Sequence, residues 1–342
     1  MKENHPIQRA VTMKDVAKAA GVGVMTVSRA FKSDQSVSIS TRTHILKVAE
    51  ELGYVLDSTA ANLRTQKTGF VAVTIPSINN ANFADTVAAL SDKLAEGGKQ
   101  VLLGYSNYDI HREEKLIEQF LQRKPEAIVL TGGRHTLRTR KLLANAGIPI
   151  VETWDLPANP LAHVVGFSNA ATMDAMVGHL VETGRTSIAF IGGDTDGDTR
   201  GADRRRGFIE AMAARGLESI RLVGAGQPPI SMKEGAAAMA RLLQDIRDTE
   251  AVICVSDLSA FGALTECMRQ GIKVPDDIAI AGFGAYEIAG ICVPTITTID
   301  PHPGRIGRRT AELLLMAMNG DTAGERLRFE IVPDLVVGGS TG

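Results

Sequence analysis

From Gly69 onward, continuous apolar runs alternate regularly with amphipathic helical stretches. A first series predicts strands at 69–76, 100–106, 127–132 and 148–153, separated by helices at 83–96, 111–123 and 136–146. A second series predicts strands at 164–169, 187–193, 221–226, 251–257 and 279–284, separated by helices at 170–183, 203–215, 233–247 and 258–270. Regular alternation predicts parallel sheets with right-handed crossovers. We therefore expect an α/β fold with two doubly wound lobes, whose ligands bind beyond the carboxyl ends of the strands.

The charges are divided unevenly along the chain. Residues 1–67 carry ten Lys and Arg against six Asp and Glu, whereas residues 68–342 carry 27 against 33. The net charge of −2 therefore hides a basic head on an acidic body. Such a split favours a nucleic-acid-binding module joined to a larger domain, although a chance excess of basic residues would give the same count.

The basic head predicts three short helices. Thr12 can cap the first helix, with Asp15 at its third position, where a carboxylate suits the helix dipole. A turn at Gly21 leads to a second helix from about Gly23, and a third helix ends at Gly53. This is the pattern of a helix-turn-helix, although other three-helix bundles can share it.

A longer motif narrows this interpretation. The string TMKDVAKAAGVGVMTVSRAF, followed by VS, TR and AEELGYV, resembles the headpiece of the LacI/GalR family of transcriptional repressors. Gly23 departs from the Ser or Thr usual at that cap, but glycine is an acceptable N-cap at a cost of a few tenths of a kcal/mol. The resemblance implies that the second helix lies in the major groove of operator DNA.

The resemblance also implies roles for individual residues of the head. Val24, Met25 and Arg29 occupy the base-reading positions. Arg29 can bind guanine O6 and N7 bidentately, whereas Val24 and Met25 offer apolar contact, for example with a thymine methyl. The residues expected to face the DNA backbone are Thr12, Thr26, Ser28 and His44. The alternative for each side chain is an ordinary solvated helix face.

The segment 57–67 corresponds to the hinge of the family. In the family this segment folds into a helix on DNA, and its leucine wedges into the minor groove. Ala60 and Leu63 match the family pattern here, while Leu56 replaces a proline and Asp57 an asparagine. The resemblance assigns DNA contact to Ala60 and Leu63; a plain linker is the alternative.

The resemblance extends from about Val11 to Gly338 and implies a periplasmic-binding-protein-like core. We expect a headpiece at 11–56, a hinge at 57–67 and an effector-binding, dimerising core at 68–342. Within the core, lobe 1 is expected at about 68–165 and 299–329, and lobe 2 at about 166–298 and 330–342. The late segments 295–300 and 326–333 are expected to cross between the lobes.

A homodimer is the expected assembly. Family dimers use helices that match Phe83–Gly97 and Leu116–Gln122, and both stretches are amphipathic here. The residues after Pro333 carry no heptads, which favours a dimer over a tetramer. A pseudo-palindromic operator is the DNA partner that such a dimer implies.

Several other classes of protein are disfavoured. The sequence holds no GxSxG, HExxH, P-loop or suitably placed GxGxxG, so we expect no enzyme and no cofactor. Its seven histidines are scattered without metal-ligand spacing, and its three cysteines do not suggest a disulfide framework or a zinc site. Without a long apolar run or an apolar N-terminal region, we expect a cytoplasmic protein that is bound to the bacterial nucleoid as a regulator.

Polar and aromatic residues follow the predicted strands of both lobes. The family places Asn82, Phe83 and Arg204 against the ligand. Trp154, the only tryptophan, could stack on an apolar sugar face or simply pack in the core. The remaining candidates for ligand contact are Arg134, His135, Glu152, Asp155, Arg200, Asp257 and Glu287.

One departure from the family suggests the class of effector. Many sugar and purine regulators carry an aspartate where this chain has Gly284. Loss of that carboxylate among Arg134, His135, Arg200 and Arg204 favours an anionic ligand, because guanidinium pairs bidentately with carboxylate. The chain also resembles the gluconate-utilisation branch of the family, in IPIVE at Ile148–Glu152 and IAGFG at 280–284.

A sugar acid such as gluconate is therefore the expected effector. A neutral sugar or a phosphosugar is the alternative, since arginines serve phosphate equally well. A cytoplasmic solute receptor without DNA function is a further alternative, against which the TVSR string counts. The sequence leaves open whether the effector induces or co-represses.

Overall fold

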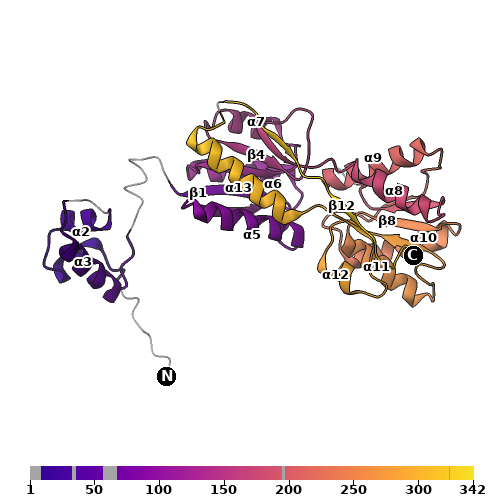
Figure 1. The fold of residues 1–342 in the computed structure, drawn as a ribbon, viewed down its shortest axis with the longest axis horizontal. Coiled ribbons are helices and arrows are strands. Elements are labelled where there is room, and N and C mark those ends of the chain that lie inside the picture. The colour runs from indigo at the N-terminus through magenta and orange to yellow at the C-terminus, as the bar shows by residue number, and fades with distance from the viewer. Residues whose placement is uncertain (1–8, 33–35, 57–67, 195–196, 323) are drawn as a thin grey trace, which may run out of the picture. The chain divides into compact units, whose positions relative to one another are not determined.

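The computed structural model describes residues 9–32, 36–56, 68–194, 197–322 and 324–342. These residues belong to two compact units, divided between Thr68 and Gly69 (Figure 1).

The first unit is a bundle of three helices, as predicted. They are α1 (Met13–Ala19), α2 (Val24–Phe31) and α3 (Ile39–Glu51). Val16, Val27 and Ile45 contribute one fully buried side chain from each helix to a small core. Gly21 has a φ of 65° in the turn between α1 and α2, a conformation that glycine adopts without strain.

A capping interaction holds the start of α1. The Asp15 carboxylate accepts hydrogen bonds from the Thr12 backbone N–H at 2.9 Å and from the Thr12 hydroxyl at 2.6 Å. Together with the favourable position of an acid in the first turn, this fixes where the helix begins.

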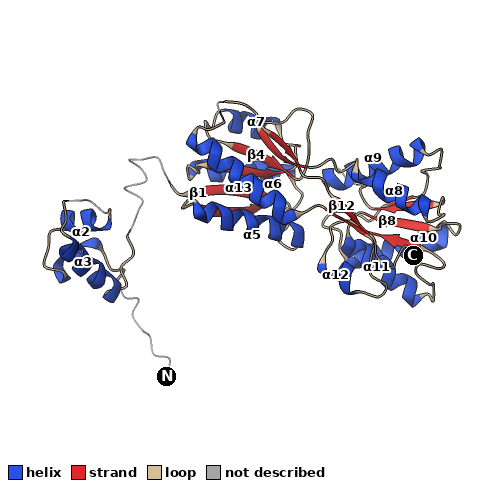
Figure 2. Cartoon of the chain, in the orientation of Figure 1, coloured by secondary structure: helices blue, strands red, loops and turns tan. Residues whose placement is uncertain are grey.

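The first lobe of the second unit contains a six-stranded parallel sheet in the order β11-β5-β4-β3-β1-β2 (Figure 2). Its strands are β1 (Phe70–Ile75), β2 (Gln100–Tyr105), β3 (Ala127–Thr131), β4 (Ile150–Thr153), β5 (His163–Gly166) and β11 (Arg328–Glu330). The central strands β3 and β4 are almost wholly buried, because helices cover both faces of a parallel sheet.

Four helices cover this sheet. They are α5 (Ala81–Glu96), α6 (Ile110–Gln122), α7 (Leu137–Ala144) and α13 (Pro303–Asn319). Helices α5 and α13 lie side by side (Figure 1) and are linked by a hydrogen bond from the Thr86 hydroxyl to the Pro303 carbonyl at 3.2 Å. A Cβ at Gly307 of α13 would lie 2.2 Å from the Thr86 carbonyl oxygen, so the two backbones approach closely here.

The second lobe contains a four-stranded parallel sheet in the order β7-β6-β8-β9. Its strands are β6 (Ile188–Ile191), β7 (Leu222–Val223), β8 (Ala251–Cys254) and β9 (Ala279–Ala281). The helices of this lobe are α8 (Thr172–Glu182), α9 (Thr199–Ala214), α10 (Met232–Asp245), α11 (Asp257–Arg269) and α12 (Glu287–Ile291).

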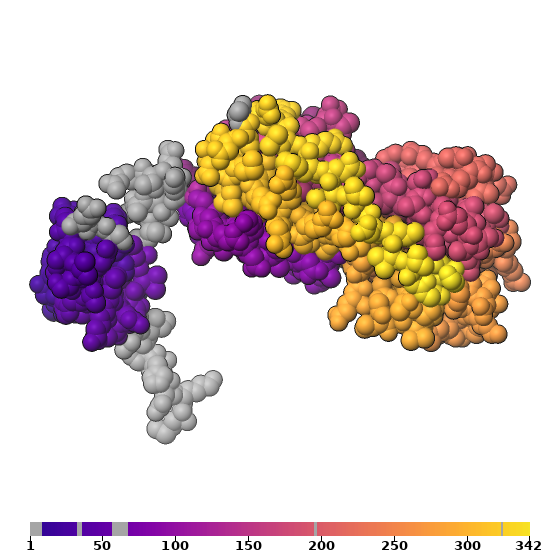
Figure 3. All heavy atoms as spheres, in the orientation of Figure 1, coloured from indigo at the N-terminus to yellow at the C-terminus, as the bar shows by residue number. Residues whose placement is uncertain are grey.

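The chain crosses between the lobes after β5, after β10 (Thr298–Asp300) and before β12 (Asp334–Val336). Strands β10 and β12 pair antiparallel, and the Ile331 N–H donates to the Gly166 carbonyl at 2.8 Å. The His302 ring contacts carboxylates of both paired segments, Asp300 at 3.2 Å and Asp334 at 2.8 Å. In Figure 3 the C-terminal part of the chain, in yellow, runs over both lobes on one face.

Two sequence predictions about the core were wrong. The strand expected to open the second lobe, 164–169, is β5 of the first sheet, paired with β4 and β11. The hydrophobic pattern of a strand does not indicate which of two sheets the strand joins, so the sequence pattern could not assign this strand to the first sheet. Helix α13 was not predicted, because the late segments were interpreted only as crossings, and part of one of them forms the edge strand β11.

Within the described ranges, no helix has both the length and the apolar character needed to cross a membrane.

The close approach of α5 and α13 leads to a prediction about stability. We expect Gly307→Ala to destabilise the core by about 1–3 kcal/mol, because its Cβ would force the Thr86 backbone away. Gly304→Ala on the same helix is the control, since no atom lies within 4 Å of its added Cβ. Denaturant unfolding of both variants measures this, and equal stability would contradict the close contact.

Candidate functional site

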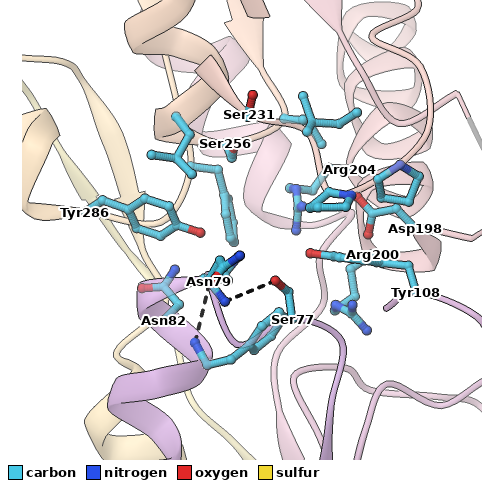
Figure 4. Close-up of a pocket in the computed structure, with 18 of the residues that line it drawn as sticks. Ser77, Asn79, Asn82, Tyr108, Asp198, Arg200, Arg204, Ser231, Ser256 and Tyr286 are labelled. Atoms are coloured by element: carbon cyan, nitrogen blue, oxygen red, sulfur yellow. Dashed lines mark hydrogen bonds between the residues drawn. The ribbon is translucent and has the colours of Figure 1, made fainter. Parts of the chain in front are cut away.

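A cavity of about 190 Å³ lies between the two lobes of the core, at the carboxyl ends of the strands (Figure 4). The first lobe lines it with Ser77, Asn79, Asn80, Asn82, Phe83, Tyr108 and Trp154. The second lobe lines it with Asp198, Arg200, Arg204, Pro228, Pro229, Ile230, Ser231, Val255, Ser256, Leu258, Phe283 and Tyr286. The position agrees with the rule for doubly wound sheets, which predicts ligands beyond the carboxyl ends of the strands.

Aromatic rings form one side of the cavity. Phe83 and Trp154 meet edge to face at 5.2 Å between ring centroids, and Trp154 meets Phe167 in the same way at 5.9 Å. Trp154 has a φ of 68°, in the left-handed region that non-glycine residues seldom adopt. Such backbone strain is often found at functional sites, where the surrounding structure holds it.

Arg204 projects from α9 toward the cavity and is 8% exposed. Its Nη1 donates to Asn169 Oδ1 at 2.6 Å, and its guanidinium lies 4.2 Å from the centre of the Phe283 ring. Among the described residues its Nε has no hydrogen-bond partner and no carboxylate lies within ion-pair distance of it, although the charge of Asp198 acts on it from further away. Burial lowers the pKa of Arg204, although an arginine stays charged at neutral pH.

Arg200 enters the cavity one helical turn earlier and is 6% exposed. Its guanidinium lies 5.5 Å from the centre of the Phe83 ring, so it reaches from the second lobe to the first. Gly132, at the end of β3, has a φ of 93°, a conformation that favours glycine, and a Cβ there would lie 2.9 Å from Nη1 of Arg200. Of the described lining residues, only Asp198 carries a carboxylate, and one of its oxygens accepts from the Gly201 N–H at 3.1 Å. The cavity therefore has an excess of positive charge.

Hydroxyl and amide groups complete the lining. The hydroxyls of Tyr108 and Tyr286 project into the cavity from opposite lobes (Figure 4). Burial raises the pKa of Tyr108 to about 12, with a contribution from the negative charge of Asp198, and burial also raises the pKa of Tyr286. Both phenols are therefore neutral at physiological pH and can donate and accept hydrogen bonds.

The structure brings five of the predicted ligand residues together. Asn82, Phe83, Trp154, Arg200 and Arg204 all line the cavity.

Arg134 lines a neighbouring cavity of about 350 Å³. Tyr108 and Arg200 contribute to both cavities, so Arg134 lies beside the first cavity rather than in it.

His135 and Glu152 are placed elsewhere, in a buried ionic cluster within the first lobe. His135 Nδ1 is bonded to Glu113 at 2.6 Å, and its Nε2 lies 3.3 Å from Glu152 Oε1. Burial alone would lower the pKa of His135, but the two carboxylates outweigh burial and raise it to about 9. These side chains do not line the cavity.

Asp155, Asp257 and Glu287 also lie outside the lining. Asp155 accepts from the Leu156 N–H at 2.8 Å, and burial raises its pKa. Asp257 is fully buried, and burial raises its pKa to about 6. Its carboxylate supports the cavity from behind, since it accepts from the Tyr286 N–H at 2.8 Å. Glu287 is exposed in the first turn of α12.

Sequence reasoning missed several lining groups, chiefly Tyr108 and Tyr286. Both follow strand ends, of β2 and β9, and this was the available signal. The position of Tyr286 depends on Gly284, whose φ is 129°. A Cβ at Gly284 would lie 2.6 Å from the Tyr286 ring. The tyrosine ring thus requires a residue without a side chain at position 284.

In the first unit, the predicted base-reading residues lie on the outer face of α2. Val24, Met25 and Arg29 are exposed, with 40% exposure for Val24 and 67% for Met25. The buried positions Val27 and Ala30 hold the opposite face against the core.

The residues predicted to face the DNA backbone are also accessible. Thr12 and His44 are exposed, and Thr26 and Ser28 are partly exposed. The predicted hinge contacts Ala60 and Leu63 lie outside the described residues.

Comparisons with known proteins match both units of the chain. Residues 12–57 match the family model of bacterial regulatory proteins of the lacI family, and residues 177–341 match a periplasmic binding protein-like domain. The HTH-type transcriptional regulator GntR of Pseudomonas aeruginosa is 34% identical over 90% of this chain and 90% of its own.

Two solved structures from Silicibacter pomeroyi are also similar. A LacI family transcriptional regulator is 41% identical, covers 79% of this chain and 98% of its own, and superposes with a TM-score of 0.75. A second LacI-family transcriptional regulator is 29% identical, covers 97% of this chain and 99% of its own, and has a TM-score of 0.90.

The buried cluster around His135 leads to a prediction about pH. Its folded pKa of about 9 exceeds the ordinary value of 6.5, so its stabilisation is complete below pH 6.5 and is lost as the pH rises through 9. We expect His135→Gln to lower the free energy of unfolding by roughly 3 kcal/mol at pH 6 and by much less at pH 10, because two buried carboxylates lose their counter-charge.

Chemical denaturation at several pH values measures this difference. His111→Gln, at an exposed position near the start of α6, is the control. A difference between His135→Gln and the parent chain that stays constant with pH would contradict the charged cluster.

Proposed function

Because the chain belongs to the LacI family of bacterial transcriptional regulators, we propose that it is a repressor whose effector is a sugar acid, with gluconate as the first compound to test. Members of the family bind operator DNA and small-molecule effectors. The proposal concerns the class of effector, the assembly and the residues that recognise each partner.

The observation that carries the effector proposal is that Arg204 is buried without an ion-pair partner among the described residues. A buried charge is costly unless a partner of opposite charge offsets it. Arg204 has an amide oxygen and an aromatic face as neighbours, and its Nε has no partner within the described part of the chain. A ligand carboxylate would supply both the missing charge and the missing acceptor.

The other lining groups suit a small polyol chain. A cavity of about 190 Å³ is small, equivalent to about six water molecules at ~30 Å³ each, and below the ~300 Å³ common for drug-sized ligands. The hydroxyls of Tyr108, Tyr286, Ser231 and Ser256 can bond sugar hydroxyls. The buried indole N–H of Trp154 has no partner among the described residues and can donate to such a group.

A phosphosugar is the second candidate, because Arg200 and Arg204 together could also pair with a phosphate. The small volume of the cavity favours the compact carboxylate. A neutral sugar would leave the charge of Arg204 without a partner.

For the DNA-bound state we propose a homodimer that places two copies of α2 on a pseudo-palindromic operator. The exposed apolar residues Val24 and Met25 and the exposed Arg29 form the base-reading face. The predicted dimer helices, 83–97 and 116–122, correspond to parts of α5 and α6 on the first lobe. Effector binding would change operator affinity only as far as the effector distinguishes two arrangements of the lobes.

The sugar-acid proposal leads to a prediction about effector binding. In a thermal-shift screen with D-gluconate, D-glucose and D-glucose 6-phosphate, we expect gluconate to give the largest stabilisation. Arg204→Met should weaken gluconate binding at least about tenfold, because a hydrogen bond to a charged group contributes about 1.5–3 kcal/mol.

Arg206→Met is the matched control for this variant. Arg206 lies on the same helix but is exposed and paired with Asp203 and Glu210. A larger shift with glucose 6-phosphate or glucose would overturn the sugar-acid assignment, as would full gluconate binding by Arg204→Met.

The second prediction concerns DNA. In gel shifts on an operator selected from random-sequence DNA, we expect Arg29→Ala to lose roughly tenfold to hundredfold in affinity, since a bidentate contact with guanine contributes about 1–3 kcal/mol. Lys47→Ala on α3 removes the same charge from an exposed side chain and should change affinity little. Two chains per operator are expected; one chain per operator, or equal losses for the two variants, would contradict the proposal.

A further inference from the structure

Asn169 is a fully buried side chain that lies behind the cavity and does not line it. It follows β5, where the chain leaves the first sheet for α8 of the second lobe. We propose that Asn169 is the positioning residue that aims Arg204 at the effector and keeps its charge available for an anion. This inference deepens the proposed function and rests on it for the identity of the effector.

Hydrogen bonds fix the orientation of the Asn169 amide at both ends. Its Oδ1 accepts from Arg204 Nη1 at 2.6 Å, and its Nδ2 donates to the Trp154 carbonyl at 3.0 Å. A flipped amide would point its N–H groups at the guanidinium, which has only donors, and its oxygen at a carbonyl. The amide therefore has a single satisfied orientation.

These contacts connect two important features of the cavity. At one end is the left-handed backbone of Trp154, whose carbonyl Asn169 binds. At the other end is Arg204, held between Asn169 and the Phe283 ring. Through this one side chain, the backbone of the first lobe sets the direction of a guanidinium of the second lobe.

The neutrality of Asn169 matters as much as its shape. A carboxylate in the same place would form a buried ion pair with Arg204 and compensate its charge. It would also place an oxygen against the Trp154 carbonyl, where a donor is needed. An amide holds the guanidinium without neutralising it, so the charge stays available for the ligand.

Asn169→Asp tests this proposal because it changes the charge at almost constant shape. Calorimetric titrations of the full chain with D-gluconate and D-glucose measure the preference for the anion. We expect Asn169→Asp to lose at least tenfold in gluconate affinity with little change for glucose. Ser168→Asp adds the same charge one residue earlier, where the side chain accepts from the Ala171 N–H, and should keep the parental preference.

A second measurement does not depend on the identity of the effector. The chain has one tryptophan, Trp154, in the cavity wall, so its fluorescence reports on small molecules that enter. We expect iodide, an anion, to quench Trp154 several-fold less in Asn169→Asp than in the parent chain. Quenching by neutral acrylamide should be the same in both. An unchanged ratio of iodide to acrylamide quenching, including no iodide quenching in either chain, overturns the proposal.

The two measurements separate this inference from the proposed function. If the parent chain does not prefer gluconate, the sugar-acid function fails, and the iodide ratio still decides the role of Asn169. If the parent chain prefers gluconate and Asn169→Asp keeps that preference, the role of Asn169 fails alone.

Asn169→Ser separates positioning from charge and replaces Asn169→Asp if that variant does not fold. It removes the amide without adding charge, so iodide quenching should persist while gluconate affinity falls about tenfold. Full gluconate affinity in Asn169→Ser would contradict a positioning role.

Discussion

The parallel direction of the strands is the constraint on which the core depends. Within each sheet every paired strand ends at the same edge, so residues from β1, β2 and β4 meet residues from β6, β8 and β9 in one small space. That convergence allows Arg204 to be buried without a carboxylate partner, since the surrounding rings and amides belong to different segments of the chain. No single segment could enclose the guanidinium on its own.

Much of this arrangement could be predicted, because it follows from alternation and from strand ends. The alternating pattern predicted the two lobes, the strand-end rule predicted Trp154 and Arg200, and the family resemblance predicted Asn82. The alternating pattern did not show that β5 belongs to the first sheet. This assignment depends on its pairing with β4, the preceding strand, and with β11, which is distant in the sequence. Helix α13 was not predicted, because the late segments of the chain were interpreted only as crossings between the lobes.

For the site residues, the sequence pattern predicted position along the chain better than the direction of the side chain. Position after a strand says that a side chain lies near the edge of the sheet, but not which way it points. His135 and Glu152 meet this criterion and yet lie in the interior of the first lobe, where the His135 ring stands between the carboxylates of Glu113 and Glu152. Tyr286 fills space that a side chain at position 284 would need, and only three-dimensional packing reveals this exchange.

The three crossings between the lobes restrict how the core can move. Segments β10 and β12 are paired, the backbones at Gly166 and Ile331 are hydrogen-bonded, and His302 ties Asp300 to Asp334. Three connected segments resist sliding and twisting of the lobes much more than bending. The easiest motion of the core is therefore a change in the angle between its two lobes. A small molecule in the cleft would then act mainly on one angle, the angle between the two lobes of the core.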